Sequence, residues 1–530
     1  MSLVRRTTHL VGWAVLCCLS TIVAHAAKAG ALSAALESIK SEDLRRHTNV
    51  LASDTFEGRE AGSRGGKAAG VYLTGELKKL RVNPGNGKLF YQHFGYDYRN
   101  VLALLPGRDP VLKREYIIVG AHYDHVGYGT ARNSRGPIGS VHNGADDNAS
   151  GTAGLLELAE AFCSFSPGPK RSVMFAFWDA EEKGLLGSKH WADHPTVSLD
   201  RVKLMVNLDM IGRLRGSTLE VYGIRTAGGL RRLLSEQNRN TDLDLEFNWD
   251  NRRDSDHYPF FTRRIPFVMF HTKKHEDYHR PSDDVGKLNL RGMQRVVRLL
   301  FQTVHTAANA PKLRPFRLAS RGEDQSIRRE QAVPLPPLPS RLGISWDADL
   351  DKQGIIQLTR VAPGSPAERA GLRIGDRILK FGSHRIAEIG DFLATVLAAK
   401  DQVSVLVQRD GESQPRELSA GLNGSPHRLG ISWREDDAEP GCITLTRVIA
   451  GSPADRAGLK PNHRIYAVSG QTFESGSAFD KLVSTLKSPL RLLVECRGRL
   501  RDVRLHLPTQ PKTAVTEISP RADKPGRREP

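Results

Sequence analysis

Five short segments between residues 121 and 284 supply histidines and carboxylates, the side chains that bind divalent metals and move protons. They are AHYDH with His122 and Asp124, GADDNASG with Asp146 and Asp147, FWDAEEKG with Glu181 and Glu182, NLDM with Asp209, and DYHRPSDD with His279. Taken singly, each acid is explained by a turn or a helix N-terminus, where carboxylates are common. Taken together, two imidazoles and several carboxylates would repel one another unless cations bound there, and the set suits Zn²⁺, Mn²⁺ or Co²⁺.

The elements that must position these side chains are visible as apolar runs just before them. The runs YIIVGA, SVMFAFWDA, LMVNLDM and PFVMF have the composition of buried strands, and GTAGLLELAEAF has the pattern of a helix. Strands that alternate with helices predict an α/β sheet buried on both faces. Ligands bind outside the carboxyl ends of the strands in such sheets, so at least three of the clusters are expected to converge on one crevice.

In this order the five motifs resemble the di-zinc aminopeptidases of metallopeptidase family 28, and the match runs through nearly all of residues 27–310. The stretch LASDTFEGREAGSRGGKAAGVYL is also similar to that family's N-terminal signature. The resemblance implies a zinc-exopeptidase (phosphorylase/hydrolase-like) α/β domain, with a mixed, mostly parallel sheet and helices on both faces. It further implies two zinc ions, or other divalent metals, and hydrolysis of peptide or protein substrates.

The resemblance also implies a role for each motif residue. Asp147 would bridge the two metals and be followed by a cis peptide bond. His122 and Asp209 would complete the site of one metal, and Glu182 and His279 that of the other. Asp124 would hydrogen-bond His122, Glu181 would be the general base, and His257 and Tyr278 would line the substrate pocket. The remaining candidates, interpreted as structural histidines, are His125, His142, His271 and His275.

Aminopeptidase activity is the favoured interpretation of this domain, with three alternatives. A carboxypeptidase or dipeptidase would use the same fold with a different substrate pocket. A glutaminyl cyclase of similar fold works with one metal and generally alters the second ligand set, whereas all five ligand types are present here. An inactive peptidase-like scaffold usually loses a ligand or the base, and Glu181 is intact.

The second half of the chain contains a repeat. RLGISW begins at Arg341 and again at Arg428, and GSPAERAGL from Gly364 matches GSPADRAGL from Gly451, both with an offset of 87. Two motifs in one register predict two copies of a domain of about 80 residues, at 341–420 and 428–508. The six prolines of residues 311–340 predict an extended linker before them, and residues 509–530 a disordered basic tail.

Each copy resembles a PDZ domain, a small α+β domain. The resemblance implies that backbone N–H groups of one loop receive the C-terminal carboxylate of a peptide, which adds a strand to the sheet edge. These loops are Leu342, Gly343 and Ile344 in the first copy and Leu429, Gly430 and Ile431 in the second. Because IGDRI becomes PNHRI in the second copy, weaker binding is expected there. The alternative is that the copies only pack on the first domain or mediate oligomerisation.

The composition and the N-terminal residues limit the expected partners and the expected location of the protein. The 530 residues carry a formal charge of +18, but no helix-turn-helix, RNP-like or zinc-finger spacing accompanies it, so nucleic acid is not an expected partner. Arg5 and Arg6, an apolar run and Ala24-His25-Ala26 predict a signal peptide at 1–26 and a secreted, periplasmic or envelope location. No stable membrane span is expected after cleavage. Three later cysteines are too few for a disulfide framework, although Cys442 and Cys496 could pair.

Overall fold

The computed structural model describes residues 30–336, 339–389 and 391–507, which divide into two compact units. Unit 1 comprises the chain up to Val333 together with Glu435–Cys442 and Val494–Arg501. Unit 2 comprises Pro334–Arg434, Ile443–Leu493 and the chain from Asp502. The predicted signal peptide and the predicted basic tail both lie outside the described residues.

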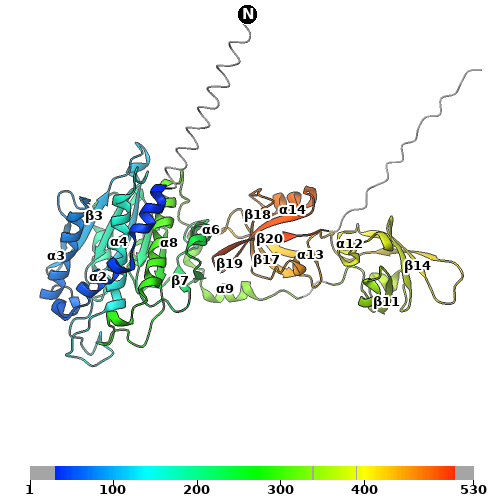
Figure 1. The fold of residues 1–530 in the computed structure, drawn as a ribbon, viewed down its shortest axis with the longest axis horizontal. Coiled ribbons are helices and arrows are strands. Elements are labelled where there is room, and N and C mark those ends of the chain that lie inside the picture. The colour runs from blue at the N-terminus through cyan, green and yellow to red at the C-terminus, as the bar shows by residue number, and fades with distance from the viewer. Residues whose placement is uncertain (1–29, 337–338, 390, 508–530) are drawn as a thin grey trace, which may run out of the picture. The chain divides into compact units, whose positions relative to one another are not determined.

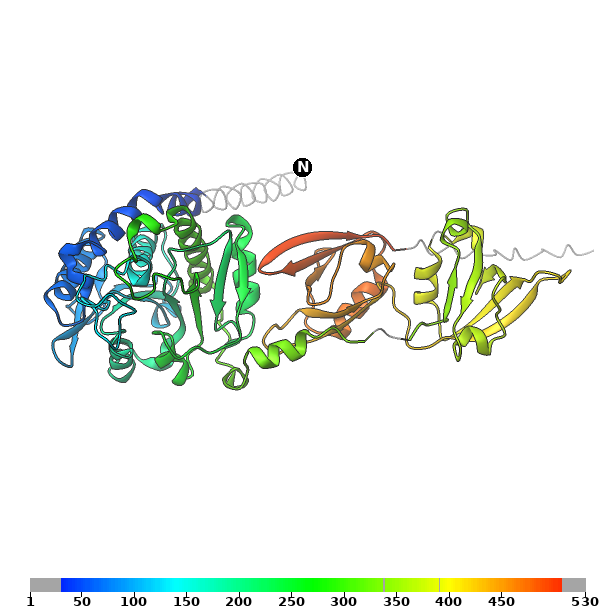
Figure 2. The same cartoon turned by 90° about the horizontal axis from the view of Figure 1, so that it is seen from below.

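Unit 1 is built on one large sheet, shown in Figures 1 and 2. Among the described residues nine strands form it, in the order β1-β3-β5-β4-β6-β9-β7-β8, with β2 paired to β3. The central strands β5, β4, β6 and β9 run parallel, and the outer strands add antiparallel pairs. The strands are β1 Asn83–Pro84, β2 Tyr91–Phe94, β3 Tyr98–Leu105, β4 Tyr116–His122, β5 Ser172–Trp178, β6 Val202–Leu208, β7 Thr218–Tyr222, β8 Asp244–Phe247 and β9 Phe267–His271.

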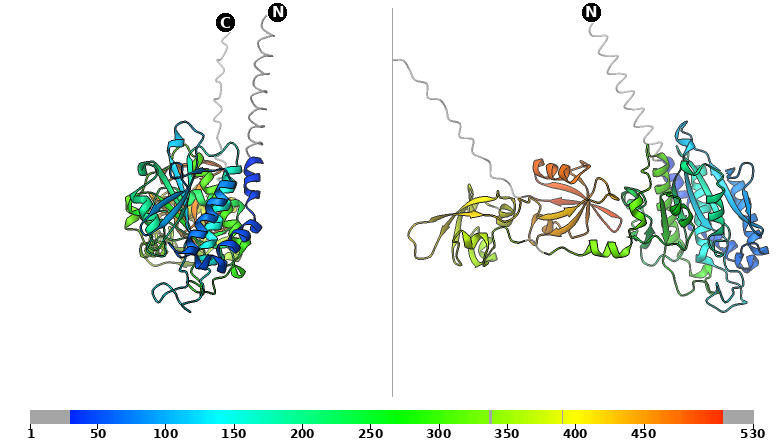
Figure 3. Two further views of the ribbon diagram at one scale, coloured as in Figure 1. Left: turned by 90° about the vertical axis from the view of Figure 1, so that its left-hand side faces the viewer. Right: turned by 180° about the vertical axis from the view of Figure 1, so that it is seen from behind.

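Helices pack on both faces of this sheet. On one face α2, α4 and α8 lie together, as Figures 1 and 3 show, and on the other face lie α5 and α7. Side chains alternate along each strand, so Val101 of β3 belongs to the first core and Leu102 to the second. The helices of this unit are α2 Ser41–Leu51, α3 Arg64–Lys79, α4 Gly151–Ser164, α5 Leu186–Asp193, α6 Leu230–Gln237, α7 Tyr258–Thr262, α8 Leu290–Asn309 and α9 Gln325–Ala332. The predicted mixed, mostly parallel sheet covered on both faces is confirmed.

Unit 2 contains two antiparallel sheets whose elements follow the predicted repeat. The first sheet has the order β10-β11-β12-β14-β15, with β13 paired to β12, and the second has the order β16-β17-β18-β19-β20. The first copy comprises β10 Ile344–Trp346, α10 Ala348–Asp351, β11 Ile356–Val361, α11 Pro366–Arg369, β12 Arg377–Phe381, β13 His384–Arg385, α12 Phe392–Ala398, β14 Gln402–Gln408 and β15 Arg416–Gly421. The second comprises β16 Ile431–Arg434, β17 Ile443–Val448, α13 Pro453–Arg456, β18 Arg464–Val468, α14 Gly476–Thr485, β19 Leu490–Cys496 and β20 Arg499–Leu505.

The predicted linker at 311–340 requires a correction. Residues up to Val333 belong to unit 1, and α9 lies within this stretch. The physical reason is a set of long-range contacts: Arg225 pairs with the carboxylate of Glu323 at 2.8 Å, and the guanidinium of Arg317 donates to the carbonyl oxygen of Arg225 at 2.9 Å. The proline content predicted an extended chain because proline restricts the local backbone. Composition carries no information about ion pairs with distant residues.

Two further expectations concern the cysteines and membranes. Among the described residues no disulfide joins any of Cys163, Cys442 and Cys496. Within the described ranges no helix is both long enough and apolar enough to cross a bilayer.

Candidate metal centre

The chemistry-bearing motifs meet at one edge of the sheet of unit 1. His122 is the last residue of β4, Asp209 directly follows β6, and Glu181 and Glu182 follow β5 by three and four residues. His279 lies in the loop after β9. Because these four strands are parallel, their carboxyl ends lie at the same edge. The predicted convergence on one crevice follows from this arrangement.

Asp147 is supplied by the turn Ala145–Ser150 that precedes α4. The side chain of Asn148 donates to the carbonyl oxygen of Leu208 at 2.9 Å and accepts from the N–H of Met210 at 3.1 Å, which ties the turn to the end of β6. Asp283 Oδ2 accepts from the N–H of Asp147 at 3.1 Å. The peptide bond between Asp147 and Asn148 is cis, as the family resemblance implied.

The two carboxylate oxygens of Asp147 face two different histidines. Oδ1 lies 3.4 Å from Nε2 of His122, and Oδ2 lies 3.1 Å from Nε2 of His279. On the first side, Asp209 Oδ1 lies 3.7 Å from the same nitrogen of His122. On the second side, Glu182 Oε2 lies 3.2 Å from the same nitrogen of His279. Asp147 therefore lies between His122 with Asp209 on one side and His279 with Glu182 on the other.

One histidine that sequence reasoning assigned to structure also reaches this site. Nδ1 of His125 lies 2.9 Å from Glu182 Oε1 and 3.9 Å from Asp147 Oδ2. One group that could hold a metal thus comprises His125, Asp147, Glu182 and His279, and a second comprises His122, Glu181 and Asp209. The signal for His125 was its place in AHYDH, only three residues after His122.

Asp124 lies beneath the two adjacent glutamates. Its carboxylate is fully buried and accepts from the backbone N–H groups of Glu181 at 3.0 Å and Glu182 at 3.3 Å. Its Oδ1 lies 3.8 Å from Nδ1 of His122, whose nearer neighbour, at 3.3 Å, is the backbone carbonyl oxygen of Asp124. Asp124 therefore orients the turn after β5 with its carboxylate and approaches His122 with its backbone.

The pKa shifts in the cluster show that its buried carboxylates ionise only where positive charge lies nearby. Burial would raise the pKa of Asp147, but contacts with His122 and His279 outweigh it and hold the pKa well below its ordinary value. Burial likewise opposes ionisation of Glu182, yet its two histidine neighbours lower the pKa to about 2. Burial, together with the charges of Glu182, Asp256 and Asp209, raises the pKa of Glu181 well above its ordinary value.

These residues fit a pair of divalent cations. Asp147, Glu182, Asp209 and Glu181 would carry four negative charges, which two such ions would balance. Nε2 of His279 is buried and has no hydrogen-bond partner in the described part of the chain, although carboxylate oxygens lie 3.1 and 3.2 Å away. A buried ring nitrogen directed at carboxylate oxygens without a hydrogen bond is suited to share a cation with them.

Arg59 is a functional candidate that sequence reasoning did not identify. Its side chain is fully buried and donates to the carbonyl oxygens of Tyr123 at 2.9 Å, Leu51 at 2.6 Å, Asn143 at 2.7 Å and Gly144 at 2.9 Å. Burial lowers its pKa to about 10, still well above neutrality, while nearby carboxylates including Asp147 and Asp124 favour the charged form. Its position in the N-terminal signature was the only sequence signal.

The two predicted substrate residues differ in their surroundings, since Tyr278 packs against the cluster whereas His257 packs within the core. The ring of Tyr278 stacks on that of His279 with centroids 3.9 Å apart. His257 is fully buried, stacks on Phe267 at 4.4 Å and places Nε2 2.8 Å from the carbonyl oxygen of Arg252. The other structural histidines have local partners: His142 lies 2.7 Å from Ser134 Oγ, and Nδ1 of His271 accepts from the N–H of Lys273 at 2.8 Å.

The loops predicted to receive peptide carboxylates precede the edge strands of the two repeats. Ile344 begins β10 and Ile431 begins β16, and Leu342 and Leu429 are buried. The carbonyl oxygens of Gly343 and Gly430 accept from Ala362 and Ile449 respectively, each at 2.8 Å. The two loops therefore have the same backbone arrangement.

Comparison with known proteins finds a family match in each part of the chain. Residues 100–304 match peptidase family M28, and residues 357–409 and 444–495 match the PDZ domain. The first match spans the sheet strands that carry the candidate metal ligands. The two later matches coincide with the two repeats.

Among curated relatives, aminopeptidase YwaD of Bacillus subtilis is 30% identical over 208 residues, which cover 37% of this chain and 42% of that protein. Leucine aminopeptidase 1 of Trichophyton equinum is 28% identical over 196 residues, covering 36% and 49% respectively. The chain thus spans less than half the length of each of these relatives. Of solved structures, the LapA aminopeptidase of Legionella pneumophila has 21% identity and a TM-score of 0.44, covering 53% of this chain and 74% of that one.

Proposed function

Since the chain contains a peptidase domain of family M28 and two PDZ domains, we propose that it is a di-zinc aminopeptidase that removes N-terminal residues from peptides. The observation that carries this proposal is Asp147, whose two oxygens face His122 at 3.4 Å and His279 at 3.1 Å. A carboxylate between two imidazoles suits a pair of zinc ions better than a single ion. The names of the curated relatives, an aminopeptidase and leucine aminopeptidases, support the same activity.

The proposed mechanism assigns one task to each side chain. Asp147 would be shared by two ions, with His122 and Asp209 completing one site and Glu182 and His279 the other. Zinc bound there would polarise the scissile carbonyl and lower the pKa of the attacking water. Glu181, which is next to a ligand without being one, accepts the proton of that water and delivers it to the leaving amine. Asp124 holds Glu181 and Glu182 in place through their N–H groups.

We also propose that the protein is exported and that its PDZ domains recruit peptides or partner proteins. The export proposal is supported by the basic, apolar and small-residue pattern of residues 1–26. The recruitment proposal is supported by the loops at Leu342–Ile344 and Leu429–Ile431, each of which leads into an edge strand. An exposed sheet edge beside a carboxylate-binding loop accepts a peptide as an added strand.

The test is a panel of matched peptides assayed with zinc present: one with both ends free, one with a blocked N-terminus and one with an amidated C-terminus. An aminopeptidase cleaves the first and third from the amino end and leaves the second intact. Release of C-terminal residues from the N-terminally blocked peptide would instead identify a carboxypeptidase. Conversion of an N-terminal glutamine to a cyclic product without peptide cleavage would identify a glutaminyl cyclase.

A further inference from the structure

We infer that the two PDZ copies are unequal: the second copy binds the carboxyl terminus of a partner polypeptide, and it accommodates only the last few residues. This inference rests on the recruitment part of the proposed function and is independent of the peptidase part. The two copies can be compared position by position, because their elements keep the offset of 87 residues.

The second copy has a groove beside its edge strand. A cavity of about 460 Å³ lies between β16, the loop before it and α14. Leu429, Gly430 and Ile431 line this cavity from the loop and strand, and Phe479 and Val483 line it from the helix. Since β16 is at the edge of its sheet, its outer side is open to an added strand.

The backbone N–H groups that would receive a carboxylate differ between the loops of the two copies. In the first copy Ser340 Oγ accepts from the N–H of Gly343 at 3.0 Å, so this donor already has a partner. The position that matches Ser340 is His427. Within the described ranges the N–H of Gly430 has no hydrogen-bond partner, so it is available to a carboxylate oxygen.

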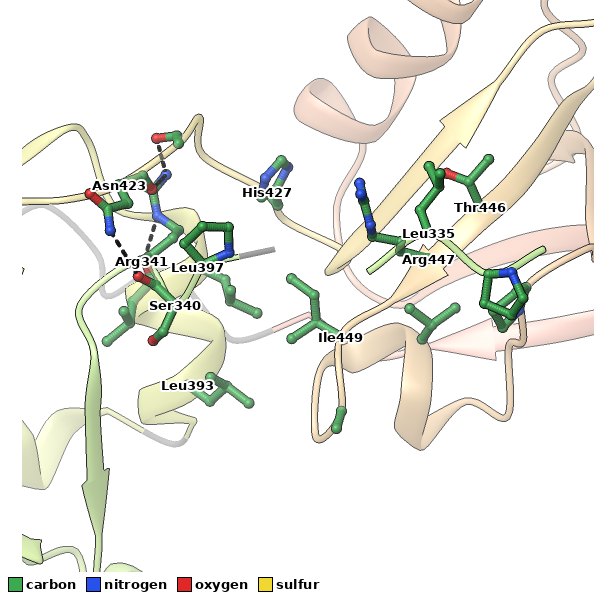
Figure 4. A pocket seen from close by; sticks show the side chains of 17 residues that line it. Leu335, Ser340, Arg341, Leu393, Leu397, Asn423, His427, Thr446, Arg447 and Ile449 are labelled. Atoms are coloured by element: carbon green, nitrogen blue, oxygen red, sulfur yellow. Dashed lines mark hydrogen bonds between the residues drawn. The ribbon is translucent and has the colours of Figure 1, made fainter. Parts of the chain in front are cut away.

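The helices beside the two grooves also differ, because the residues on the rim are apolar in the first copy and polar in the second. Leu393 and Leu397 of α12 are replaced in α14 by Asp480 and Ser484, which are exposed on the rim of the second groove. Figure 4 shows Leu393 and Leu397 on one side of a different cavity, of about 810 Å³, with Ile449 of the second copy on the other side. The carbonyl oxygen of Leu397 accepts from the N–H of His427 at 2.7 Å. The rim of the first copy is therefore used for packing within unit 2.

Trp433 limits the length of the second groove. A Cβ atom on Gly476, the first residue of α14, would lie 1.9 Å from Cη2 of Trp433, so the indole rests directly on the helix. The same ring packs edge-on against Phe479 with centroids 6.1 Å apart. An indole that reaches from β16 to α14 closes the groove at that end. Between Gly430 and Trp433 there is room for roughly three ligand residues at about 3.3 Å each.

The turn that predicted weaker binding in the second copy is preserved. Asn462 replaces Gly375 and adopts the same left-handed conformation, with φ 69° against 90°. The N–H of Asn462 donates to Leu445 at 2.7 Å, as that of Gly375 donates to Leu358 at 2.8 Å. The loss of IGDRI therefore does not alter this turn. We expect the second copy, and not the first, to bind the peptide more tightly.

The experiment measures binding by fluorescence anisotropy to pools of random tripeptides and octapeptides that carry an N-terminal fluorophore, which also prevents trimming. Ser432→Trp fills the second groove, and Ser345→Trp is the matched control at the equivalent position of the first copy. We expect Ser432→Trp to weaken binding at least tenfold and Ser345→Trp to change it less than twofold. Amidated pools should bind at least tenfold more weakly, and tripeptides should bind as well as octapeptides.

The opposite pattern, with loss in Ser345→Trp and retention in Ser432→Trp, would overturn the assignment, as would equal binding of amidated pools. A tenfold advantage of octapeptides would overturn the length limit. Should Ser432→Trp unfold, Ser484→Trp replaces it, because Ser484 is exposed on the same rim. Hydrolysis of an aminoacyl chromogenic substrate by each variant reports separately on the peptidase, so failure of one proposal is distinguishable from failure of the other.

Discussion

The backbone N–H of Glu181 donates a hydrogen bond of 3.0 Å to Oδ1 of the fully buried Asp124. Asp124 follows β4 and Glu181 follows β5, so this bond joins the ends of two neighbouring parallel strands. The proposed base is thereby held by a residue whose backbone also approaches the proposed ligand His122. One residue, Asp124, therefore contacts both the proposed base and a proposed metal ligand.

Replacing Glu181 tests the proposed base. Glu181→Gln keeps the size of the side chain but cannot accept a proton, so we expect kcat to fall by about 100- to 10,000-fold. Zinc content, measured by mass spectrometry, should remain two ions per chain, because Glu181 is not one of the proposed ligands. Wild-type kcat with both ions bound would contradict the assignment.

Replacing Asp124 tests its positioning role. Asp124→Asn loses one acceptor oxygen and presents an amide N–H to the N–H groups of Glu181 and Glu182. We expect a loss of about 10- to 100-fold in activity or zinc affinity, the usual effect of a residue behind the ligands. Asp200→Asn is the control, since Asp200 is exposed and lies before β6, at the opposite end of that strand from Asp209. Equal activity of Asp124→Asn and wild type would exclude the role.

Removing metal tests the ligand set. Chelation should abolish hydrolysis, and added Zn²⁺ should restore it. Because metal binds the folded state preferentially, the thermal midpoint should fall on chelation, corresponding to about 4 kcal/mol if zinc had been present at 1,000 times its Kd. Asp147→Ala should lose both ions, since it is shared between the two donor groups. Retention of both ions in this variant would argue against a bridging carboxylate.

Arg59 is expected to stabilise the loops that carry His122 and Asp147. Arg59→Met removes the guanidinium that donates to four carbonyl oxygens, three of them in buried hydrogen bonds, so the free energy of unfolding should fall by at least about 3 kcal/mol. Urea denaturation measures this change. Arg64→Met, at a side chain that is 86% exposed, should alter stability by less than about 0.5 kcal/mol. Equal effects of the two substitutions would contradict the prediction.

The raised pKa of the buried Glu157 predicts that the free energy of unfolding depends on pH. Burial raises its pKa to about 8, and burial lowers the pKa of the neighbouring His47, 3.6 Å away, to about 4. Between pH 6.5 and 8 the folded state therefore retains a proton on Glu157 that the unfolded state has released, and stability falls as pH rises. The fall is roughly 2 kcal/mol over this interval at 1.36 kcal/mol per pH unit.

Glu157→Gln should remove this decline, because glutamine does not titrate. Thermal midpoints recorded at pH 6.5 and pH 8 measure the effect. Glu160→Gln is the comparison on the same helix: burial also raises the pKa of Glu160, but Glu160 is less buried, so its replacement should remove a smaller part of the decline. A decline of the same size in Glu157→Gln and wild type would assign it to another group.

Much of the site was predictable because its signals are local. An apolar run followed by a carboxylate or histidine identifies the end of a buried strand, and this pattern located His122, Asp209 and Glu182. The repeat offset likewise located both small domains, since each copy keeps its motifs in register. Such features depend only on neighbouring residues, which is why they can be read from the chain alone.

The tertiary structure decided which groups meet across long separations. The order β5-β4-β6-β9 places the oxygens of Asp147 between two histidines 157 residues apart in the chain, and the same order brings His125 to Glu182. Arg59 donates to carbonyl oxygens as far away as residue 144, and Arg225 pairs with Glu323 of the predicted linker. Sequence determined the fold class, the repeat and the types of ligand. Strand order and packing determined the distances, because these arise from contacts between segments that no local pattern encodes.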